Sequence, residues 1–380
     1  MPYIILGCDK LSELPKLVTN YSNILLITGG QSFKNSHHYK SLLNNLNDKT
    51  IYSVPIFEEP SPDFIYETVK NHRQYNIDAV VAIGGGSVLD SCKSISAMLT
   101  VPDSVMNYLE GFDVKSHPGT KVPFIAIPTT SEVGSEMTKN AVLRKVSPNG
   151  FKKSLRHDNF IPNIAIVDPK LTLSCNINMT VACGLDAFTH LIESYLSTNG
   201  SPITDALALD GIRYFSEGFV QSRLNGYSDL DTRKCMSYAS MLGGICLANP
   251  GLGTVHGFTS ALGGFYNITH GVVCATLLPP YTKLIIERLL ENKEDNMIYL
   301  NKYKLVGEIL YGDKASTVEK GCKMLIDKLY GFVEDFDIPR LSPYDICEDD
   351  FDRIINRTSN NFNPIALSYE DLYYILKERL

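Results

Sequence analysis

One stretch decides the fold class: AVVAIGGGSVLDSCKSISAM, residues 79–98. An apolar run of strand type is followed by three consecutive glycines and then by the apolar spacing of a helix. Glycine lets the backbone approach a ligand closely, and the N-terminus of the following helix favours a phosphate group. Ser87 and Asp90 have the spacing of a helix capping box with Ser87 as the cap. Since the glycines do not form the G-x-G-x-x-G pattern, a tight turn with an ordinary cap is the alternative interpretation.

The same alternation of strand and helix continues on both sides of this stretch. Apolar runs bounded by turn residues predict strands at 24–28, 51–54, 78–83, 122–127 and 164–168. Helical spacing lies between several of them, at 64–74 and 87–99. This alternation predicts parallel βα units in an N-terminal α/β domain.

The pattern changes after Asp168-Pro169, where convincing strands disappear. Helical spacing is present at 180–196, 203–219, 230–247 and 315–331. We therefore predict two domains, an α/β nucleotide-binding domain over residues 1–172 and an all-α domain over residues 173–380.

Composition excludes several classes of protein. A chain of 380 residues with 44% hydrophobic residues is long and apolar enough for two folded cores. A net charge of −7 argues against a nucleic-acid partner, and no apolar run approaches the roughly 18–20 residues of a membrane-spanning helix. Nine cysteines without a C-x-x-C pair are typical of reduced thiols. We expect a cytoplasmic protein without a membrane partner.

A second polar segment, FIAIPTTSEVGSEMTKN (residues 124–140), also follows a predicted strand. Its Thr129, Thr130, Thr138 and Asn140 offer hydroxyl and amide groups to a polar ligand. On its own, this segment is typical of a polar surface loop. Paired with the glycine-rich turn, it favours one extended ligand such as a dinucleotide.

A third group of residues carries metal-binding chemistry. Asp186 and His190 are four residues apart and share one helix face, while His256 and His270 lie in a later glycine-rich segment. Each residue alone has an ordinary explanation, a solvated ion pair or a core or capping histidine. Together, three imidazoles and one carboxylate form a candidate site that suits Fe²⁺ or Zn²⁺ better than Mg²⁺ or Ca²⁺.

These segments together resemble the iron-dependent (group III) alcohol dehydrogenase family, over nearly the whole chain. The resemblance is carried by GGGSVLDSCK, IPTTSEVGSEMT, IAIVDPKLTLS, GLDAFTHLIESYLS, GLGTVHGF, ITHGVVC and the C-terminal NPIALSYEDLYYIL. It implies a dehydroquinate-synthase-like fold, metal ligation by the four residues above, and hydride transfer between a small alcohol or aldehyde and NAD(P). It also implies a homodimer. Cofactor contacts implied by the resemblance map to Gly85, Gly86, Ser87, Thr129, Thr130, Thr138, Asn140 and Lys152.

Three departures from the family pattern bear on function. Gly29, Gly30 and Ser32 stand where many NAD-preferring relatives have an acidic residue, which favours NADP modestly. Val133 replaces a hydroxyl-bearing residue, beside Glu132, in the second loop. Ser260 occupies the place of a further histidine implicated in proton transfer, so it is only a weak catalytic candidate.

Rival functions remain open on the sequence alone. Within the superfamily, the alternatives are a glycerol-dehydrogenase-type enzyme and a dehydroquinate-synthase-type lyase. A further alternative is a non-catalytic nucleotide-binding regulator that keeps the fold.

Overall fold

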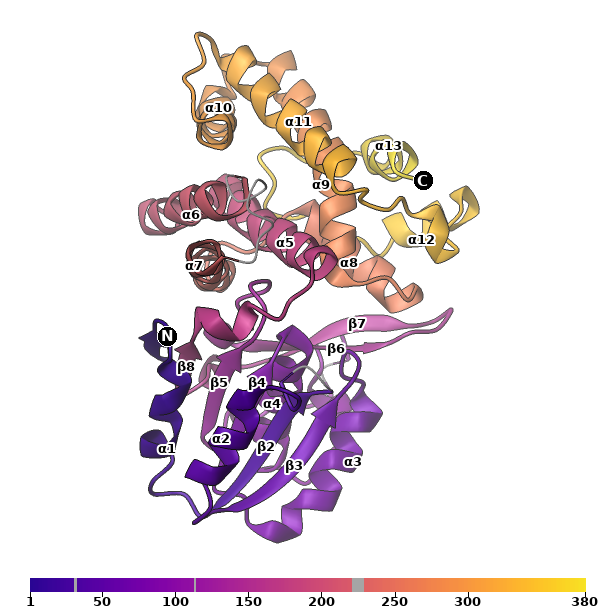
Figure 1. The fold of residues 1–380 in the computed structure, drawn as a ribbon. Helices are drawn as coiled ribbons and strands as arrows, with labels where there is room; N and C mark the ends of the chain where they lie inside the picture. The colour runs from indigo at the N-terminus through magenta and orange to yellow at the C-terminus, as the bar shows by residue number, and fades with distance from the viewer. Residues whose placement is uncertain (31–32, 113, 221–228) are drawn as a thin grey trace. The chain divides into compact units, whose positions relative to one another are not determined.

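The computed structural model describes residues 1–30, 33–112, 114–220 and 229–380, and Figure 1 shows its ribbon. Contacts divide the chain into two compact units. The first comprises residues 1–145 and 152–175, and the second comprises 146–151 and 176–380. The sequence analysis placed the boundary between residues 172 and 173.

The first unit is built on a six-stranded sheet in which every neighbouring pair is parallel. The strand order is β1-β8-β5-β4-β2-β3. The strands are β1 (Tyr3–Leu6), β2 (Asn23–Gly29), β3 (Thr50–Ile56), β4 (Ala79–Gly84), β5 (Phe124–Pro128) and β8 (Ile164–Val167). Five were predicted, and β1 was missed because its four residues are half-exposed at the sheet edge. The predicted parallel α/β architecture is confirmed.

A second ladder of this chain was not predicted at all. Strands β6 (Asn140–Lys145) and β7 (Phe151–Arg156) form a separate two-stranded sheet. Their sequences, NAVLRK and FKKSLR, carry too many polar and charged residues to read as buried strands.

The central strands are buried on both faces, as expected of a sheet covered by helices. The helices of this unit are α1 (Leu14–Leu17), α2 (His37–Asn45), α3 (Pro62–His72) and α4 (Gly86–Met98). On one face, Leu26 and Val81 share a buried cluster with Leu14 of α1 and Leu42 of α2. Helix α4 packs along β4 and β5 (Figure 1).

The strand order reverses direction between β2 and β4. The chain passes from β2 outward to β3, and from β4 outward in the other direction to β5. Parallel α/β sheets bind ligands at the carboxyl ends of the two strands that flank such a reversal. Those ends are Gly29 of β2 and Gly84 of β4, which both belong to segments predicted to bind nucleotide.

The second unit consists of helices, which confirms the predicted all-α half. They are α5 (Ile177–Leu196), α6 (Pro202–Phe215), α7 (Leu230–Leu247), α8 (Thr254–Phe265), α9 (His270–Glu291), α10 (Met297–Tyr311), α11 (Val318–Asp335), α12 (Phe351–Ile355) and α13 (Tyr369–Glu378). Helix α5 packs against α6, α7 and α9. The helix predicted over 203–219 is α6 followed by a π-helical turn at Ser216–Val220.

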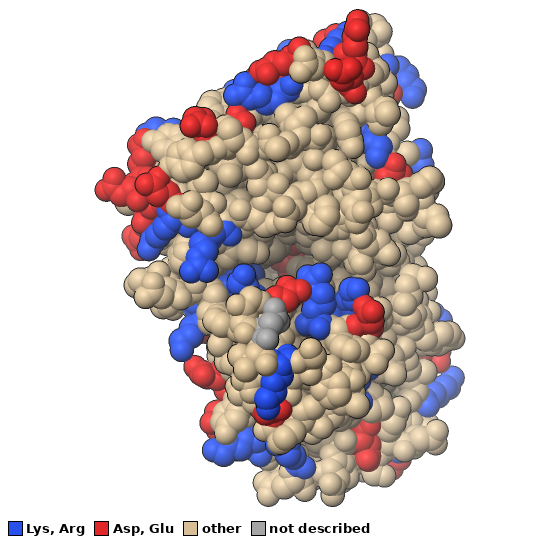
Figure 2. Space-filling view, turned by 180° about the vertical axis from the view of Figure 1, so that it is seen from behind, with Lys and Arg blue, Asp and Glu red and all other residues tan. Residues whose placement is uncertain are grey.

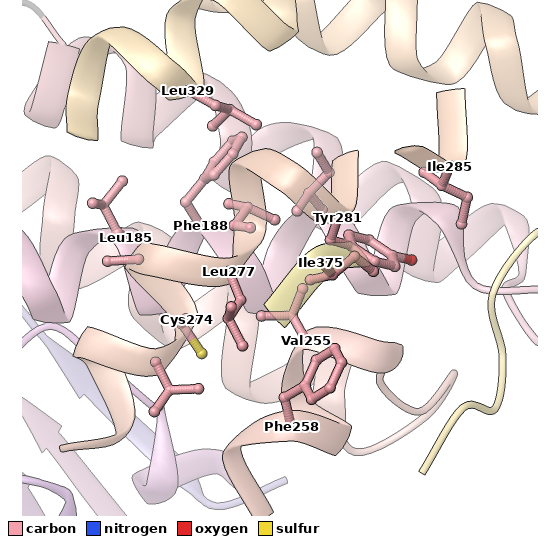
Figure 3. Packing of buried hydrophobic residues seen from close by; sticks show 14 of the residues in the cluster. Leu185, Phe188, Val255, Phe258, Cys274, Leu277, Tyr281, Ile285, Leu329 and Ile375 are labelled. Carbon is pink, nitrogen blue, oxygen red and sulfur yellow. The ribbon is translucent and has the colours of Figure 1, made fainter. Parts of the chain in front are cut away.

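One large apolar core holds the helical unit together. An apolar stripe on α5 is buried in it, formed by Val181, Leu185, Phe188, Ile192 and Tyr195. Figure 3 shows Leu185 and Phe188 beside residues of α8, α9, α11 and α13, among them Val255, Leu277, Leu329 and Ile375. Burial of such side chains contributes about 1.5–3 kcal/mol each, so this stripe fixes α5 at the centre of the unit.

Charged side chains of both signs are scattered over a surface that is otherwise uncharged (Figure 2). On the face shown in Figure 2, Lys and Arg are interspersed with Asp and Glu. Ion pairs such as Lys323–Asp327 lie largely in solvent and contribute little to stability. No helix in the described ranges has both the length and the apolar character needed to cross a membrane.

Candidate metal centre and nucleotide-binding loops

Four side chains in the helical unit come together as a ligand cluster: Asp186, His190, His256 and His270. One ligand atom from each lies within 4.8 Å of the others. These are the four residues that the sequence analysis selected, and the fold gathers them from three helices.

The local structure of α5, α8 and α9 explains this convergence. Asp186 and His190 lie one turn apart on α5, and both are buried. His256 is in the first turn of α8, and His270 is the first residue of α9. With Asp186 at 0% exposure, the alternative of a solvated ion pair on α5 is wrong.

The Asp186 carboxylate is the centre of the ligand cluster. Its Oδ1 lies 3.4 Å from His270 Nε2, 3.6 Å from His256 Nε2 and 3.7 Å from His190 Nδ1. Neither carboxylate oxygen accepts a hydrogen bond from the residues that the structure describes. A buried carboxylate is costly without hydrogen bonds or a cation, so this arrangement fits a bound divalent ion.

Two of the histidines are oriented by hydrogen bonds at ring nitrogen Nδ1. His190 Nδ1 donates to the backbone carbonyl of Asp186 at 2.9 Å. His256 Nδ1 lies 2.6 Å from Oε2 of Glu193. In metal sites a hydrogen bond of this kind leaves the other imidazole nitrogen as the ligand.

The charges of the ligand cluster shift its pKa values. Burial raises the pKa of Asp186, but His270 and His190 outweigh it and hold that pKa well below its usual range. Burial, with His256 close by, lowers the pKa of His190 to about 3. Burial also opposes a proton on His256, yet Glu193 and Asp186 raise its pKa to about 9. Without a cation, these shifts favour an ionised Asp186 and a proton on His256 rather than on His190.

The weak catalytic candidate, Ser260, lies one turn beyond His256 on α8. Its side chain is exposed, and its Oγ donates to the backbone oxygen of His256 at 3.4 Å. This is a hydrogen bond within the helix to the backbone of His256, and it does not involve a ligand atom of the cluster.

In the first unit, the glycine-rich turn joins β4 to α4 as predicted, but its cap differs. Gly85 is the N-cap residue and α4 begins at Gly86, so Ser87 lies inside the helix. The predicted capping box is therefore wrong. Asp90 instead accepts from Ser135 Oγ at 2.6 Å and from the Val142 backbone at 2.9 Å. As the cap, Gly85 has no side chain that could accept hydrogen bonds from the first N–H groups of α4.

The structure brings the two predicted loops together. The Thr129 backbone donates to the Gly84 carbonyl at 3.0 Å. A Cβ built on Gly85 would lie 3.3 Å from the Thr130 side chain, so a glycine allows the close approach. A Cβ on Gly86 would lie 3.4 Å from Val133 and 3.9 Å from Oε2 of Glu132. Glu132 thus lies near the N-terminus of α4. A carboxylate there interacts favourably with the helix dipole, but it would repel a phosphate group.

A buried lysine, which sequence analysis missed, ties these loops to α4. Lys93 is 1% exposed and its Nζ donates to Ser135 Oγ at 3.1 Å and Thr138 Oγ1 at 2.8 Å. It also donates to the backbone oxygens of Ser135 and Asn140, at 2.9 and 2.7 Å. Burial lowers the pKa of Lys93 to about 8 and raises that of the neighbouring Glu136 to about 7. The hydroxyl of Thr138 is therefore held by Lys93 in a buried network.

The remaining predicted cofactor residues lie in the same unit. Gly29 ends β2 and Gly30 follows it, while Ser32 lies outside the described residues. Lys152 is on β7 and pairs with Glu59, with 2.9 Å between Nζ and Oε2. Its charge is thus already partly compensated within the protein.

Comparison with known proteins places both units in one family. Residues 2–169 match the sequence model of iron-containing alcohol dehydrogenases, and residues 180–380 match the C-terminal model of the same family. Alcohol dehydrogenase 4 of Saccharomyces cerevisiae is 32% identical over 99% of this chain and 96% of its own length. Long-chain-alcohol dehydrogenase 1 of Geobacillus thermodenitrificans is 40% identical over 60% of this chain and 58% of its own.

Solved structures agree with the sequence matches. The alcohol dehydrogenase from Oenococcus oeni superposes with a TM-score of 0.87 at 25% identity, covering 100% of this chain and 99% of its own. The resemblance stated from the motifs is confirmed. The glycerol-dehydrogenase, dehydroquinate-synthase and regulator alternatives are not favoured by these matches.

The Lys93 network predicts a large loss of stability when the lysine is removed. Lys93→Met removes the hydrogen bonds from Nζ to Ser135, Thr138 and Asn140. Because these acceptors are buried, leaving each one unsatisfied costs about 1–3 kcal/mol. Urea unfolding measures the change, with Lys323→Met as a matched control. Because Lys323 forms an exposed pair with Asp327, the control should lose only a small fraction of that amount. Equal losses in the two variants would contradict the assigned role of Lys93.

The raised pKa of His256 predicts that cation binding to the ligand cluster depends on pH. A cation must displace the proton, so affinity falls as pH drops below the pKa of about 9 and rises toward it. The apparent Kd for Zn²⁺ should tighten by about tenfold per pH unit between about pH 6.5 and pH 8.5. Competition with a chelator of known affinity gives this Kd. A Kd that stays constant over this interval would show that no proton is displaced.

Proposed function

The chain belongs to the iron-containing alcohol dehydrogenase family, and from this premise we propose how its own residues serve an oxidoreductase reaction. The reaction is hydride transfer between a small primary or secondary alcohol, or the matching aldehyde or ketone, and NAD(P). The observation that carries the proposal is the ligand cluster, four donor atoms within 4.8 Å of one another around a buried carboxylate.

The ligand cluster would hold one divalent cation through Asp186 and the three imidazoles. Fe²⁺ is the first choice, because the family is iron-containing and nitrogen-rich sites suit iron; Zn²⁺ is the second. Such a cation would act as a Lewis acid toward the substrate oxygen, and the nicotinamide would accept or supply the hydride. Asp186 supplies a fixed negative charge, and the hydrogen bonds on His190 and His256 keep their rings in place.

The glycine-rich turn and the second loop would hold the nucleotide. The end of α4 at Gly85, Gly86 and Ser87 offers backbone N–H groups, which favour phosphate at a helix N-terminus. Thr129 and Thr130 adjoin this end, and Gly29 and Gly30 lie at the neighbouring strand end. The reversal of strand order between β2 and β4 supports the same location.

We propose further contacts for the residues that lie around these two loops. Lys93 holds Thr138 and Asn140 in place by hydrogen bonds, and these two residues would position the loop that binds the nucleotide. Lys152 would contact the nucleotide directly. Ser32, with Gly29 and Gly30, would tolerate the 2′-phosphate of NADP. We further propose a cytoplasmic homodimer formed along β1, an edge strand of the sheet whose Tyr3 is 67% exposed.

The metal assignment is tested by removing its central charge. Asp186→Ala should lose bound iron or zinc, because three imidazoles without the carboxylate hold a divalent cation far less well. Metal content by atomic emission should fall by at least about tenfold, and production of NAD(P)H from small alcohols should fall with it. Binding of NAD(P)H, followed by its fluorescence, should remain within a factor of about two. Unchanged metal content in the purified variant would refute the ligand assignment.

The NADP preference is tested at Gly29. A Cβ built there meets only Val88 at 4.0 Å, whereas one on Gly30 would lie 2.6 Å from the Phe57 ring. Gly29→Asp should shift the ratio of kcat/KM toward NAD by about tenfold or more, because a carboxylate accepts the ribose hydroxyls and repels a 2′-phosphate. The neutral control Gly29→Asn has nearly the same shape. If both variants change the ratio equally, charge at this strand end does not select the cofactor.

A further inference from the structure

Glu193 of α5 connects the ligand cluster to the start of α8. Its side chain is 1% exposed, and its carboxylate faces three donors. Oε1 accepts from the backbone N–H of Val255 at 2.8 Å, and Oε2 accepts from Gly253 at 3.0 Å. Oε2 also lies 2.6 Å from His256 Nδ1.

The position of Glu193 on α5 follows the spacing of the cluster. Asp186, His190 and Glu193 are separated by four and three residues, so they lie along one face of the helix. The first two enter the ligand cluster directly. Glu193 reaches the N-terminus of α8, where the helix dipole also stabilises a carboxylate.

We propose that Glu193 is a positioning residue, which holds His256 with Nδ1 protonated and Nε2 directed toward the Asp186 carboxylate. A carboxylate can only accept, so its hydrogen bond requires a proton on Nδ1. Nε2 is then the nitrogen whose lone pair is left for a cation once the imidazole is neutral, and it lies 3.6 Å from Asp186 Oδ1. This inference rests on the proposed function, since it concerns how the ligand cluster binds its cation.

The surroundings of Glu193 show that its place is closely defined. A Cβ built on Gly253 would lie 2.9 Å from Oε1 of Glu193, so a larger residue there would displace the carboxylate. The same helix end is held from another side by Asn363, whose Oδ1 accepts from the Thr254 backbone at 3.2 Å. Asn363 therefore shares with Glu193 the capping of α8, whereas the hydrogen bond with His256 Nδ1 is made by Glu193.

This difference gives a matched pair of variants. Glu193→Gln removes the charge and half of the accepting capacity next to His256, while keeping the shape of the side chain. Asn363→Ala removes a cap of α8 and leaves Glu193 in place. Metal-free protein is titrated with Co²⁺ alone, with the Kd taken from chelator competition and the coordination followed by visible absorption.

Glu193→Gln should weaken Co²⁺ binding by about 10–100-fold and change the Co²⁺ absorption spectrum. Asn363→Ala should lower the Tm of the metal-free protein and leave the Kd within about twofold. Equal weakening in both variants, or wild-type binding in Glu193→Gln, would overturn the inference. If the wild-type protein binds no Co²⁺, the proposed function itself fails and this inference with it.

A second measurement does not depend on any variant folding. In a crystal structure of the Zn²⁺-loaded wild-type protein, His256 should bind the metal through Nε2 with Nδ1 against Glu193. Ligation through Nδ1 would overturn the inference while leaving the proposed metal site intact.

Discussion

The helices α5, α8 and α9 converge on the buried carboxylate of Asp186. At 0% exposure a carboxylate loses several kcal/mol of hydration, which only close positive or polar partners can offset. Here the partners are imidazoles at 3.4 to 3.7 Å, brought from the middle of α5 and the first turns of α8 and α9. The packing of these helices is therefore constrained by the chemistry of the site as well as by apolar contacts.

Helix α5 meets both demands because its faces differ. One face carries Leu185, Phe188 and the rest of the apolar stripe, which fix the helix in the core. Another face carries Asp186 and His190 toward the ligand cluster. A helix buried on nearly all sides holds its polar side chains more rigidly than a surface helix would, and metal ligands need that rigidity.

The sequence predicts most of this arrangement where a periodic pattern is strong. The parallel strands, α5 and α7 follow from apolar spacing, and the four ligands follow from residue types that match a metal site. Contacts made over long separations were not predictable from local patterns. Glu193 reaches Gly253 across 60 residues and Lys93 reaches Ser135 across 42, and neither residue has a local signal for its partner.

The capping box predicted from local sequence at the start of α4 was wrong. Ser87 and Asp90 fit the spacing of a capping box, but the helix begins at Gly86, and Asp90 bonds to Ser135 and Val142 instead. The capping rule assumes that the helix starts after the first hydroxyl residue. In a glycine-rich turn the backbone can start the helix earlier, because glycine adopts the cap conformation without needing a side chain. The edge strand β1 and the polar ladder of β6 and β7 were missed for a related reason, since their short or charged sequences have no clear period.

The two units each bury a charged side chain, and the way each charge is satisfied separates a structural role from a functional one. The ammonium of Lys93 donates to oxygens of the second loop and of Asn140, so its hydrogen-bonding capacity is used by the fold. The carboxylate of Asp186, within the described parts of the chain, accepts no hydrogen bond and is surrounded by ring nitrogens instead. A fold that needed only stability would pair that carboxylate with donors, as Asp90 is paired with Ser135. A carboxylate without hydrogen bonds, at a position where three helices converge, is what a cation site requires, because a cation binds oxygen lone pairs that hydrogen bonds have not already taken.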